Sequence, residues 1–389
     1  MRAAGVAGGV ASRPPRSTAA TAVVAVLAAT ASLSLTPWLG KPMFPDEGVS
    51  LRSARLSWTA LLSQSRTVDL VLLPYYALLH EWIRVSEGLE WARLLSLVAY
   101  GLTVFLVGYL AARWGGSWCG VLAAALAATS PLLVAAALSA RPYALSALLA
   151  TVAVAVLVRW AKDGRAAMAW WFACATLATL ALQMFAVLAP LSALAAAAAL
   201  RPRGLRGRWR AAVGPIGLTL AATLSFAVAA AAQRRQIAWI PSLVTGRQLV
   251  DAVEGPASGQ TALFGVVVLV IAGAAAAVCL KAWSRGAPEP TRAEVELLAI
   301  CFAWAAFPTA ALVAVSLARH VYVARYATAS VPGLAIGVSL LSARAVDAVV
   351  GRRADRARVA GIVALACAVV LVWLVCSLPA ARATYELAR

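Results

Sequence analysis

Two adjacent carboxylates, Asp46 and Glu47, stand directly after the first long apolar segment of the chain. Pro45 and Gly48 flank them, so a solvated turn is one interpretation of the pair. Carboxylates at a membrane surface are rarely needed for packing, and they are suited to removing a proton from an incoming hydroxyl group. We therefore take Asp46 and Glu47 as candidate catalytic residues.

Two later segments place arginine and tyrosine side chains where apolar segments begin. The first contains Arg141 and Tyr143, and the second contains Arg319, Arg325 and Tyr326. A guanidinium group can donate two parallel hydrogen bonds to phosphate oxygens, so both segments could hold a phosphate. Contacts of these side chains with lipid headgroups, as part of a basic interfacial belt, are the plainer alternative.

The composition indicates a membrane protein that crosses the bilayer several times. Of 389 residues, 63% are hydrophobic and 13% are charged, whereas about 25% of residues are charged in soluble domains. The apolar residues are mostly Ala, Val and Leu, which predicts packed helices rather than a membrane barrel. The net charge of +19 lies mainly in short loops, which indicates positive-inside topology and argues against nucleic-acid binding.

We predict an all-α bundle of about eleven transmembrane helices, because each span needs about 20 apolar residues. The long apolar run 168–200 is divided at Gln183 in this layout. The predicted spans are 19–38, 93–112, 117–137, 142–160, 167–183, 185–200, 211–232, 260–280, 297–317, 326–343 and 360–380.

The expected organisation is a cytoplasmic tail, 1–18, followed by one transmembrane domain, 19–389. Two large loops, 39–92 and 233–259, then lie on the extracytoplasmic side. This layout leaves the larger share of the 34 basic residues in the cytoplasm and puts the C-terminus outside. The first apolar segment could instead be a cleaved signal peptide, because arginines precede it.

The first large loop contains two segments, 55–62 and 74–83, that suit amphipathic helices on the membrane surface. The same loop holds Asp69 and His80. The chain has no HxxH or DxD spacing, no phosphate-binding glycine loop and no dinucleotide fingerprint. We therefore expect no tightly bound metal or cofactor, and a loosely held divalent cation stays open.

Several short motifs occur in an order that resembles the GT-C superfamily of polyprenyl-phosphate-sugar-dependent glycosyltransferases. The similarity is to the branch of glycosyltransferase family 39, with protein O-mannosyltransferases and aminoarabinose transferases. The motifs are Phe44-Pro-Asp-Glu47, Asp69 with Pro74-Tyr-Tyr-Ala-Leu-Leu-His-Glu-Trp82, Ala92-Arg-Leu-Leu-Ser96, Ala140-Arg-Pro-Tyr-Ala-Leu145, Gln236-Ile-Ala-Trp-Ile240, and Ala324-Arg-Tyr326 with Pro332-Gly333.

The resemblance implies inverting transfer of a monosaccharide from a polyprenyl-phosphate donor to an acceptor hydroxyl, on a protein or glycolipid, at the extracytoplasmic face. It makes Asp46 the base and lets Glu47 orient the sugar or acceptor. The donor phosphate is then expected at Arg141, Tyr143, Arg319, Arg325 and Tyr326. The sugar or acceptor is expected at Asp69, Tyr75, Tyr76, His80, Gln236 and Trp239.

The preference for Ala, and for Arg over Lys, is typical of a high-GC bacterium such as an actinobacterium, so mannose is the first expectation for the sugar and arabinose the second. A secondary transporter or lipid flippase of the cell envelope is the alternative class. Those proteins usually bury ionisable groups in mid-membrane and show repeated halves, whereas the 15 acidic residues here fall in loops or at span ends. A non-catalytic envelope scaffold would tolerate the loss of Asp46.

Overall fold

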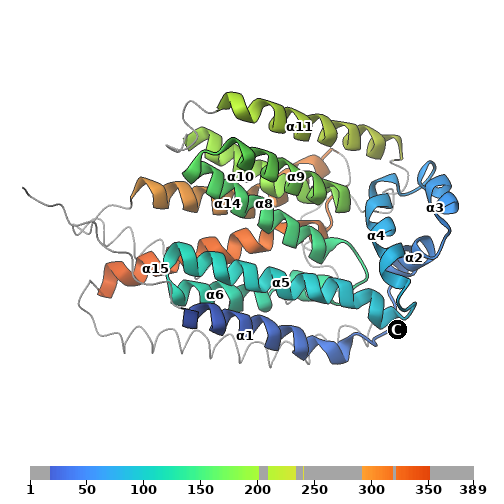
Figure 1. The fold of residues 1–389 in the computed structure, drawn as a ribbon, viewed down its shortest axis with the longest axis horizontal. Helices are drawn as coiled ribbons and strands as arrows, with labels where there is room; N and C mark the ends of the chain where they lie inside the picture. The colour runs from blue at the N-terminus through green and yellow to red at the C-terminus, as the bar shows by residue number, and fades with distance from the viewer. Residues whose placement is uncertain (1–17, 201–208, 234–239, 241–290, 319–320, 351–389) are drawn as a thin grey trace, which may run out of the picture.

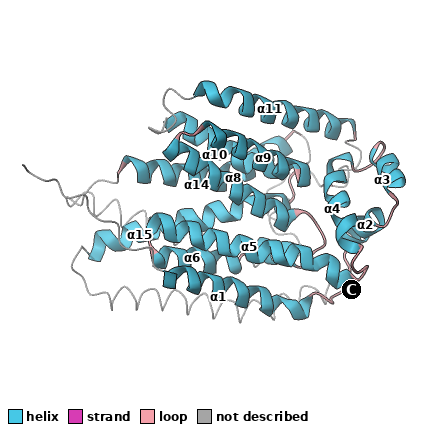
Figure 2. Cartoon of the chain, in the orientation of Figure 1, coloured by secondary structure: helices cyan, strands magenta, loops and turns pink. Residues whose placement is uncertain are grey.

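The computed structural model describes residues 18–200, 209–233, 240, 291–318 and 321–350, and these parts form helices and no β-strand. Long helices run side by side along the molecule (Figure 1; Figure 2). They are α1 (Thr18–Leu35), α5 (Leu89–Gly115), α6 (Ser117–Ala128), α8 (Tyr143–Asp163), α9 (Ala166–Leu182), α10 (Leu188–Leu200), α11 (Trp209–Ala232), α14 (Arg292–Ser316) and α15 (Val331–Val350).

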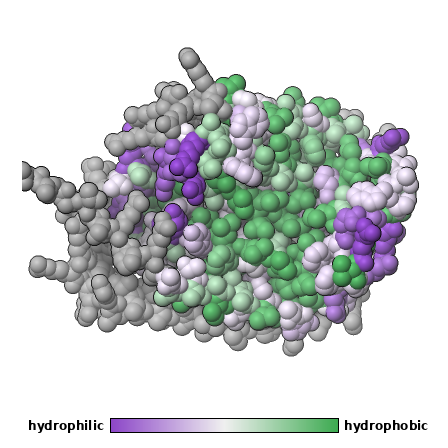
Figure 3. Space-filling model, in the orientation of Figure 1, coloured by the Kyte–Doolittle hydropathy of each residue, from purple (hydrophilic) through white to green (hydrophobic). Residues whose placement is uncertain are grey.

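The surface of this bundle matches a bilayer. Six of the described helical segments are long and apolar enough to cross a membrane, and a bent pair could form a seventh span. Figure 3 shows a hydrophobic band across the middle of one face, with hydrophilic residues gathered toward both ends. A helical bundle satisfies its backbone hydrogen bonds internally, as the hydrocarbon region requires. The multi-pass, all-α prediction is therefore confirmed.

The predicted span 117–137 is not one continuous helix. The chain forms α6 and then a short helix, α7 (Pro131–Ala137), and the two are bent by 63°. Pro131 supplies no backbone N–H, and Ser130 before it is extended with ψ of 121°. Proline and its restricted neighbour end a helix at this point.

The division of the apolar run 168–200 at Gln183 is confirmed. Here α9 ends at Leu182, and the side chain of Gln183 caps a 3-10 turn, η3 (Met184–Val187), before α10 begins. The helices α9 and α10 have 17 and 13 residues. The predicted spans 260–280 and 360–380 lie outside the described residues, so the count of eleven stays a prediction.

Three short helices form a cap at one end of the bundle (Figure 1). This cap consists of α2 (Pro45–Ala54), α3 (Trp58–Ser65) and α4 (Leu73–Ile83). The expected helix at 55–62 begins three residues later, because the Ser57 hydroxyl accepts a hydrogen bond from Ala60 N and starts α3 there. A 3-10 turn, η2 (Leu70–Leu72), precedes α4.

The sequence predicted that the apolar face of segment 74–83 lies on the membrane surface. In the structure, helix α4 does not lie that way. Its apolar side chains Tyr75, Tyr76, Leu79 and Ile83 are buried in a core shared with α2, α3 and the bundle. Burial of this face covers the bundle end instead. The cap is thus a packed part of the domain.

Two tryptophans fasten the cap to α5. The indole rings of Trp82 and Trp91 are stacked, with centroids 4.9 Å apart. Each indole N–H donates to the backbone carbonyl of the other residue, at 2.8 and 2.9 Å. The side chain of Gln233, just after α11, connects the end of α11 to the cap segment. It accepts a hydrogen bond from Leu70 N and donates one to Ser65 O.

A third set of contacts fixes the turn η5 (Ala324–Ser330) that precedes α15. The indole N–H of Trp304, in α14, donates to Ala329 O at 2.7 Å. Gly333 lies directly against the same indole, since a Cβ there would be 2.7 Å from a ring carbon. The close approach holds α15 and η5 beside the cap end of the bundle.

Candidate active site

Asp46 and Glu47 occupy the first turn of α2. Phe44 is extended at the N-cap and Pro45 begins the helix, as is common at helix starts. Carboxylates are favoured there by the helix dipole. Because successive residues on an α-helix point about 100° apart, the two neighbours enter different surroundings.

Glu47 is buried, with its side chain 1% exposed. Its carboxylate accepts two hydrogen bonds from Arg93, at 2.9 and 2.6 Å. It also accepts from Phe44 N at 2.9 Å and from Ala140 N at 2.8 Å. Glu47 therefore joins the start of α2 to α5 and to the segment before α8.

Arg93, which the sequence reading did not select, is fully buried and completes this junction. Besides Glu47, its guanidinium donates to the carbonyl oxygens of Leu39, Lys41 and Pro42, at 2.7, 2.7 and 3.1 Å. All of its N–H groups are thus used. The sequence did carry a signal that could have identified Arg93, because a lone arginine at the start of an apolar span needs a buried partner.

The expectation that Glu47 orients sugar or acceptor does not fit this placement. Its four short hydrogen bonds occupy both carboxylate oxygens, and no part of the group is open to an incoming substrate. The geometry gives Glu47 a positioning role, in which it fixes the turn that carries Asp46.

Asp46 is open instead, with its side chain 42% exposed. One carboxylate oxygen, Oδ2, lies 2.9 Å from a terminal nitrogen of Arg325, whose side chain is 36% exposed. Arg325 belongs to η5, so the fold brings together two residues that are almost 280 positions apart in sequence.

Arg141 also contacts Asp46, through the backbone of Asp46. It donates to the backbone carbonyl of Asp46 at 3.3 Å and to the hydroxyl of Ser50 at 3.0 Å. Its guanidinium carbon lies 5.9 Å from the ring centre of Tyr143, and that of Arg325 lies 6.0 Å from the same ring. Two cations therefore share one aromatic ring.

Further aromatic rings continue from Tyr143. The ring of Tyr326 lies 6.3 Å from Tyr143 and 5.0 Å from Phe185. These rings come from α8, η5 and η3, three elements far apart in the chain. The structure brings Arg141, Tyr143, Arg325 and Tyr326 together, and their expected role at a donor phosphate stays a prediction.

Tyr75 and Tyr76 extend the site into α4. Burial raises the pKa of both phenols above the usual range, and Asp69 raises that of Tyr76 further. Both therefore stay neutral and can donate. Tyr76 donates to the Asp69 carboxylate at 3.0 Å, while the buried hydroxyl of Tyr75 and Nε of Arg141 have no hydrogen-bond partner among the described residues.

His80 lies apart from this cluster. Its Nδ1 is 2.7 Å from Ala54 O at the end of α2, and its ring packs against Trp58. Asp69 caps η2 in the left-handed region with φ of 58°. The other predicted residues, Arg319, Gln236 and Trp239, lie outside the described residues.

The charge of the cluster suits an anion. Arg93 pairs with the carboxylate of Glu47, Arg325 pairs with that of Asp46, and Arg141 donates to the backbone carbonyl of Asp46. The described residues contain no group of three His, Cys, Asp or Glu side chains that could hold a metal ion. The arrangement thus places a solvent-accessible carboxylate beside guanidinium groups, and the question of a loosely held cation stays a prediction.

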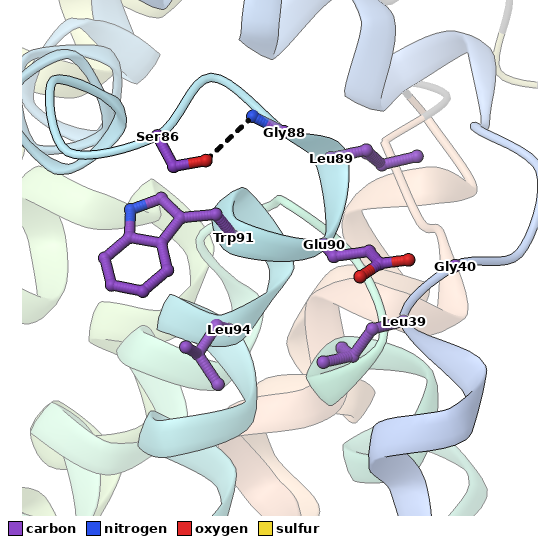
Figure 4. Close-up of a pocket in the computed structure, with 8 residues that line it drawn as sticks. All are labelled: Leu39, Gly40, Ser86, Gly88, Leu89, Glu90, Trp91 and Leu94. Carbon is purple, nitrogen blue, oxygen red and sulfur yellow. Dashed lines mark hydrogen bonds between the residues drawn. The ribbon is translucent and has the colours of Figure 1, made fainter.

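A separate open cavity of about 610 Å³ lies between the end of η1 (Thr36–Trp38) and the start of α5 (Figure 4). Its lining residues are Leu39, Gly40, Ser86, Gly88, Leu89, Glu90, Trp91 and Leu94. It adjoins the Arg93 junction through Leu39, and the Asp46 cluster does not line it. This cavity is therefore not part of the Asp46 cluster, and the candidate chemistry stays at Asp46.

The fold and its apolar surface define a polytopic, all-α membrane protein. The structure is similar to that of the arabinosyltransferase EmbB from Mycobacterium smegmatis, with a TM-score of 0.50 and 18% identity. The similarity covers 84% of this chain and 30% of EmbB, so the chain spans less than a third of that protein.

ArnT from Cupriavidus metallidurans is also similar in structure, with a TM-score of 0.44 and 15% identity over 85% of this chain and 78% of ArnT. No protein-family model and no curated protein sequence matches the chain. The expected GT-C-like fold is confirmed by the similarity to EmbB.

Proposed function

We propose that this protein is an inverting glycosyltransferase that moves a monosaccharide from a polyprenyl-phosphate donor to an acceptor hydroxyl. One observation carries the proposal: Asp46 has an exposed carboxylate at one end of a membrane bundle, where Arg325 contacts the carboxylate and Arg141 contacts the backbone of the same residue. The GT-C-like fold supports it, because its neighbour EmbB is an arabinosyltransferase.

In the proposed reaction, Asp46 takes the proton of the acceptor hydroxyl. The hydroxyl oxygen forms a bond to the anomeric carbon from the face opposite the phosphate, and the bond from that carbon to the phosphate oxygen breaks. Polyprenyl phosphate leaves with the electron pair, and the configuration is inverted. Positive charge develops on the sugar during this displacement, as in inverting glycosidases.

Arg141 and Arg325 stabilise the departing phosphate. A well-placed donor of this kind contributes about 3 kcal/mol to the transition state. The neutral hydroxyl of Tyr75, which is buried near this cluster, is a further donor for sugar or phosphate. We also propose that the cap faces the extracytoplasmic side and that the donor chain stays in the bilayer.

Mannose is our first proposal for the sugar and arabinose the second, with a protein or glycolipid as acceptor. The test uses membranes that contain the wild type, Asp46→Asn or Glu87→Gln, supplied with radiolabelled polyprenyl-phosphate mannose and then arabinose. Glu87 is a matched control because its side chain is 75% exposed and pairs only with Arg55 among the ion pairs of the described residues.

We expect Asp46→Asn to lower transfer at least about 100-fold, because removal of a general base costs 10²–10⁴-fold, and Glu87→Gln to leave it unchanged. Protein and lipid fractions are counted separately to identify the acceptor. Equal transfer by wild type and Asp46→Asn would reject Asp46 as the base. Absence of transfer from every donor, with substrate movement across vesicles, would favour the transporter class.

A further inference from the structure

We propose that Arg325 is an exchangeable partner that occupies Asp46 until a phosphate-bearing donor binds, so that the donor must bind before the acceptor is activated. The inference rests on the proposed function and adds an order of binding to it. The donor phosphate would draw the Arg325 guanidinium from the Asp46 carboxylate to itself. The freed oxygen, Oδ2, then accepts the proton of the acceptor hydroxyl.

The first step of the argument compares two neighbouring ion pairs. Glu47 and Arg93 are both buried, and each has further hydrogen bonds that close the junction. Breaking that pair would leave a buried charge without compensation. Asp46 and Arg325 are 42% and 36% exposed, so water replaces either partner at little cost. Only the second pair can exchange readily.

The second step compares the two arginines beside Asp46. Arg141 donates to a backbone carbonyl and to Ser50, and these bonds leave the Asp46 carboxylate untouched. Arg325 contacts the carboxylate itself, at 2.9 Å. Arg141 can therefore bind an anion without any change at the Asp46 carboxylate, whereas an anion that draws the terminal nitrogen of Arg325 toward itself weakens the contact of Arg325 with Asp46.

The third step concerns the destination of Arg325. Both guanidinium carbons lie about equally far, 5.9 and 6.0 Å, from the ring of Tyr143. A phosphate placed beside this ring lies near both guanidinium groups, and charge-assisted bonds from two arginines favour an anion strongly. A phosphate therefore offers Arg325 a partner that competes with Asp46.

The experiment measures the chemical accessibility of Asp46 rather than sugar transfer. Detergent-solubilised full-length protein is treated with a water-soluble carbodiimide and glycine ethyl ester, and labelling at each carboxylate is quantified by peptide mass spectrometry. The probe is farnesyl phosphate, which has no sugar and so leaves the acceptor side open. Farnesol is the control without phosphate, and Glu87, paired with Arg55, is the internal control.

We expect farnesyl phosphate to increase the labelling rate of Asp46 about fivefold relative to Glu87, which is the factor that corresponds to an exposed ion pair of roughly 1 kcal/mol. Farnesol should have no effect. In Arg325→Gln, Asp46 should label at the fast rate with or without farnesyl phosphate. The comparison within the wild type does not depend on whether this variant folds.

Unchanged or slower labelling of Asp46 with farnesyl phosphate would overturn the exchange. Slow labelling in a folded Arg325→Gln protein would do the same. The two proposals can fail separately: release of Asp46 without any sugar transfer would reject only the glycosyltransferase, and sugar transfer without release would reject only the exchange.

Discussion

At the scale of single residues, Asp46 and Glu47 differ in exposure, because consecutive residues of a helix point in different directions. Asp46 points toward solvent and Glu47 into the interior. We expect Glu47→Gln to destabilise the protein by about 3–5 kcal/mol, since Arg93 would keep its buried charge without a carboxylate. Asp46→Asn should cost no more than about 1 kcal/mol, because its pair is partly exposed. Thermal unfolding in detergent would show a large shift for the first variant alone.

Equal unfolding temperatures for the two variants would contradict these roles.

The sequence alone could not separate the roles of Asp46 and Glu47, because the helical phase of α2 is set by Phe44 at its N-cap. Arg93 was overlooked for a related reason. Its value as a site residue depends on carbonyl oxygens of the segment 39–42, which only the folded chain brings together.

At the scale of helices and turns, the contact between α14 and α15 positions Arg325. We predict that Gly333→Ala destabilises the protein by about 1–3 kcal/mol, because the new Cβ would lie 2.7 Å from the Trp304 ring. Gly217→Ala in α11 is the matched control, since the Cβ position of Gly217 has no neighbouring atom within 4 Å among the described residues. Gly217→Ala should be neutral or slightly stabilising.

Unfolding in detergent and sugar transfer would both be measured for these variants. If Gly333→Ala left the unfolding temperature unchanged, α14 and α15 could separate without a loss of stability.

The sequence predicted most of the helices here, because apolar length is sufficient to find a span. It missed the bend after α6, where a single proline outweighs the apolar run, and it placed α4 on the membrane although its aromatic face packs inward.

At the scale of the whole molecule, the hydrophobic band and the cap predict opposite exposures for two cysteine substitutions. In a background without native cysteines, Thr59→Cys in the cap should react with a membrane-impermeant maleimide on intact cells. Ala167→Cys, at the start of α9, should react only after the membrane is opened. Both residues are exposed in the structure.

The reverse labelling pattern would place the candidate site in the cytoplasm and would reject the predicted topology. The distribution of basic residues is the basis of that prediction. The assembly of the site was less predictable, because Asp46, Arg141 and Arg325 meet only when three distant helical elements pack at one end.

The length of α5 has a consequence for how a lipid substrate is reached. Its 27 residues span about 40 Å, whereas the hydrocarbon core of a bilayer is about 30 Å thick. An untilted α5 would therefore extend about two turns beyond the hydrocarbon, and Arg93 lies in the second turn from the cap end. In the proposed reaction, the neighbouring Asp46 would then work at the depth of the lipid headgroups, and a polyprenyl chain would remain dissolved in the membrane while its sugar is transferred.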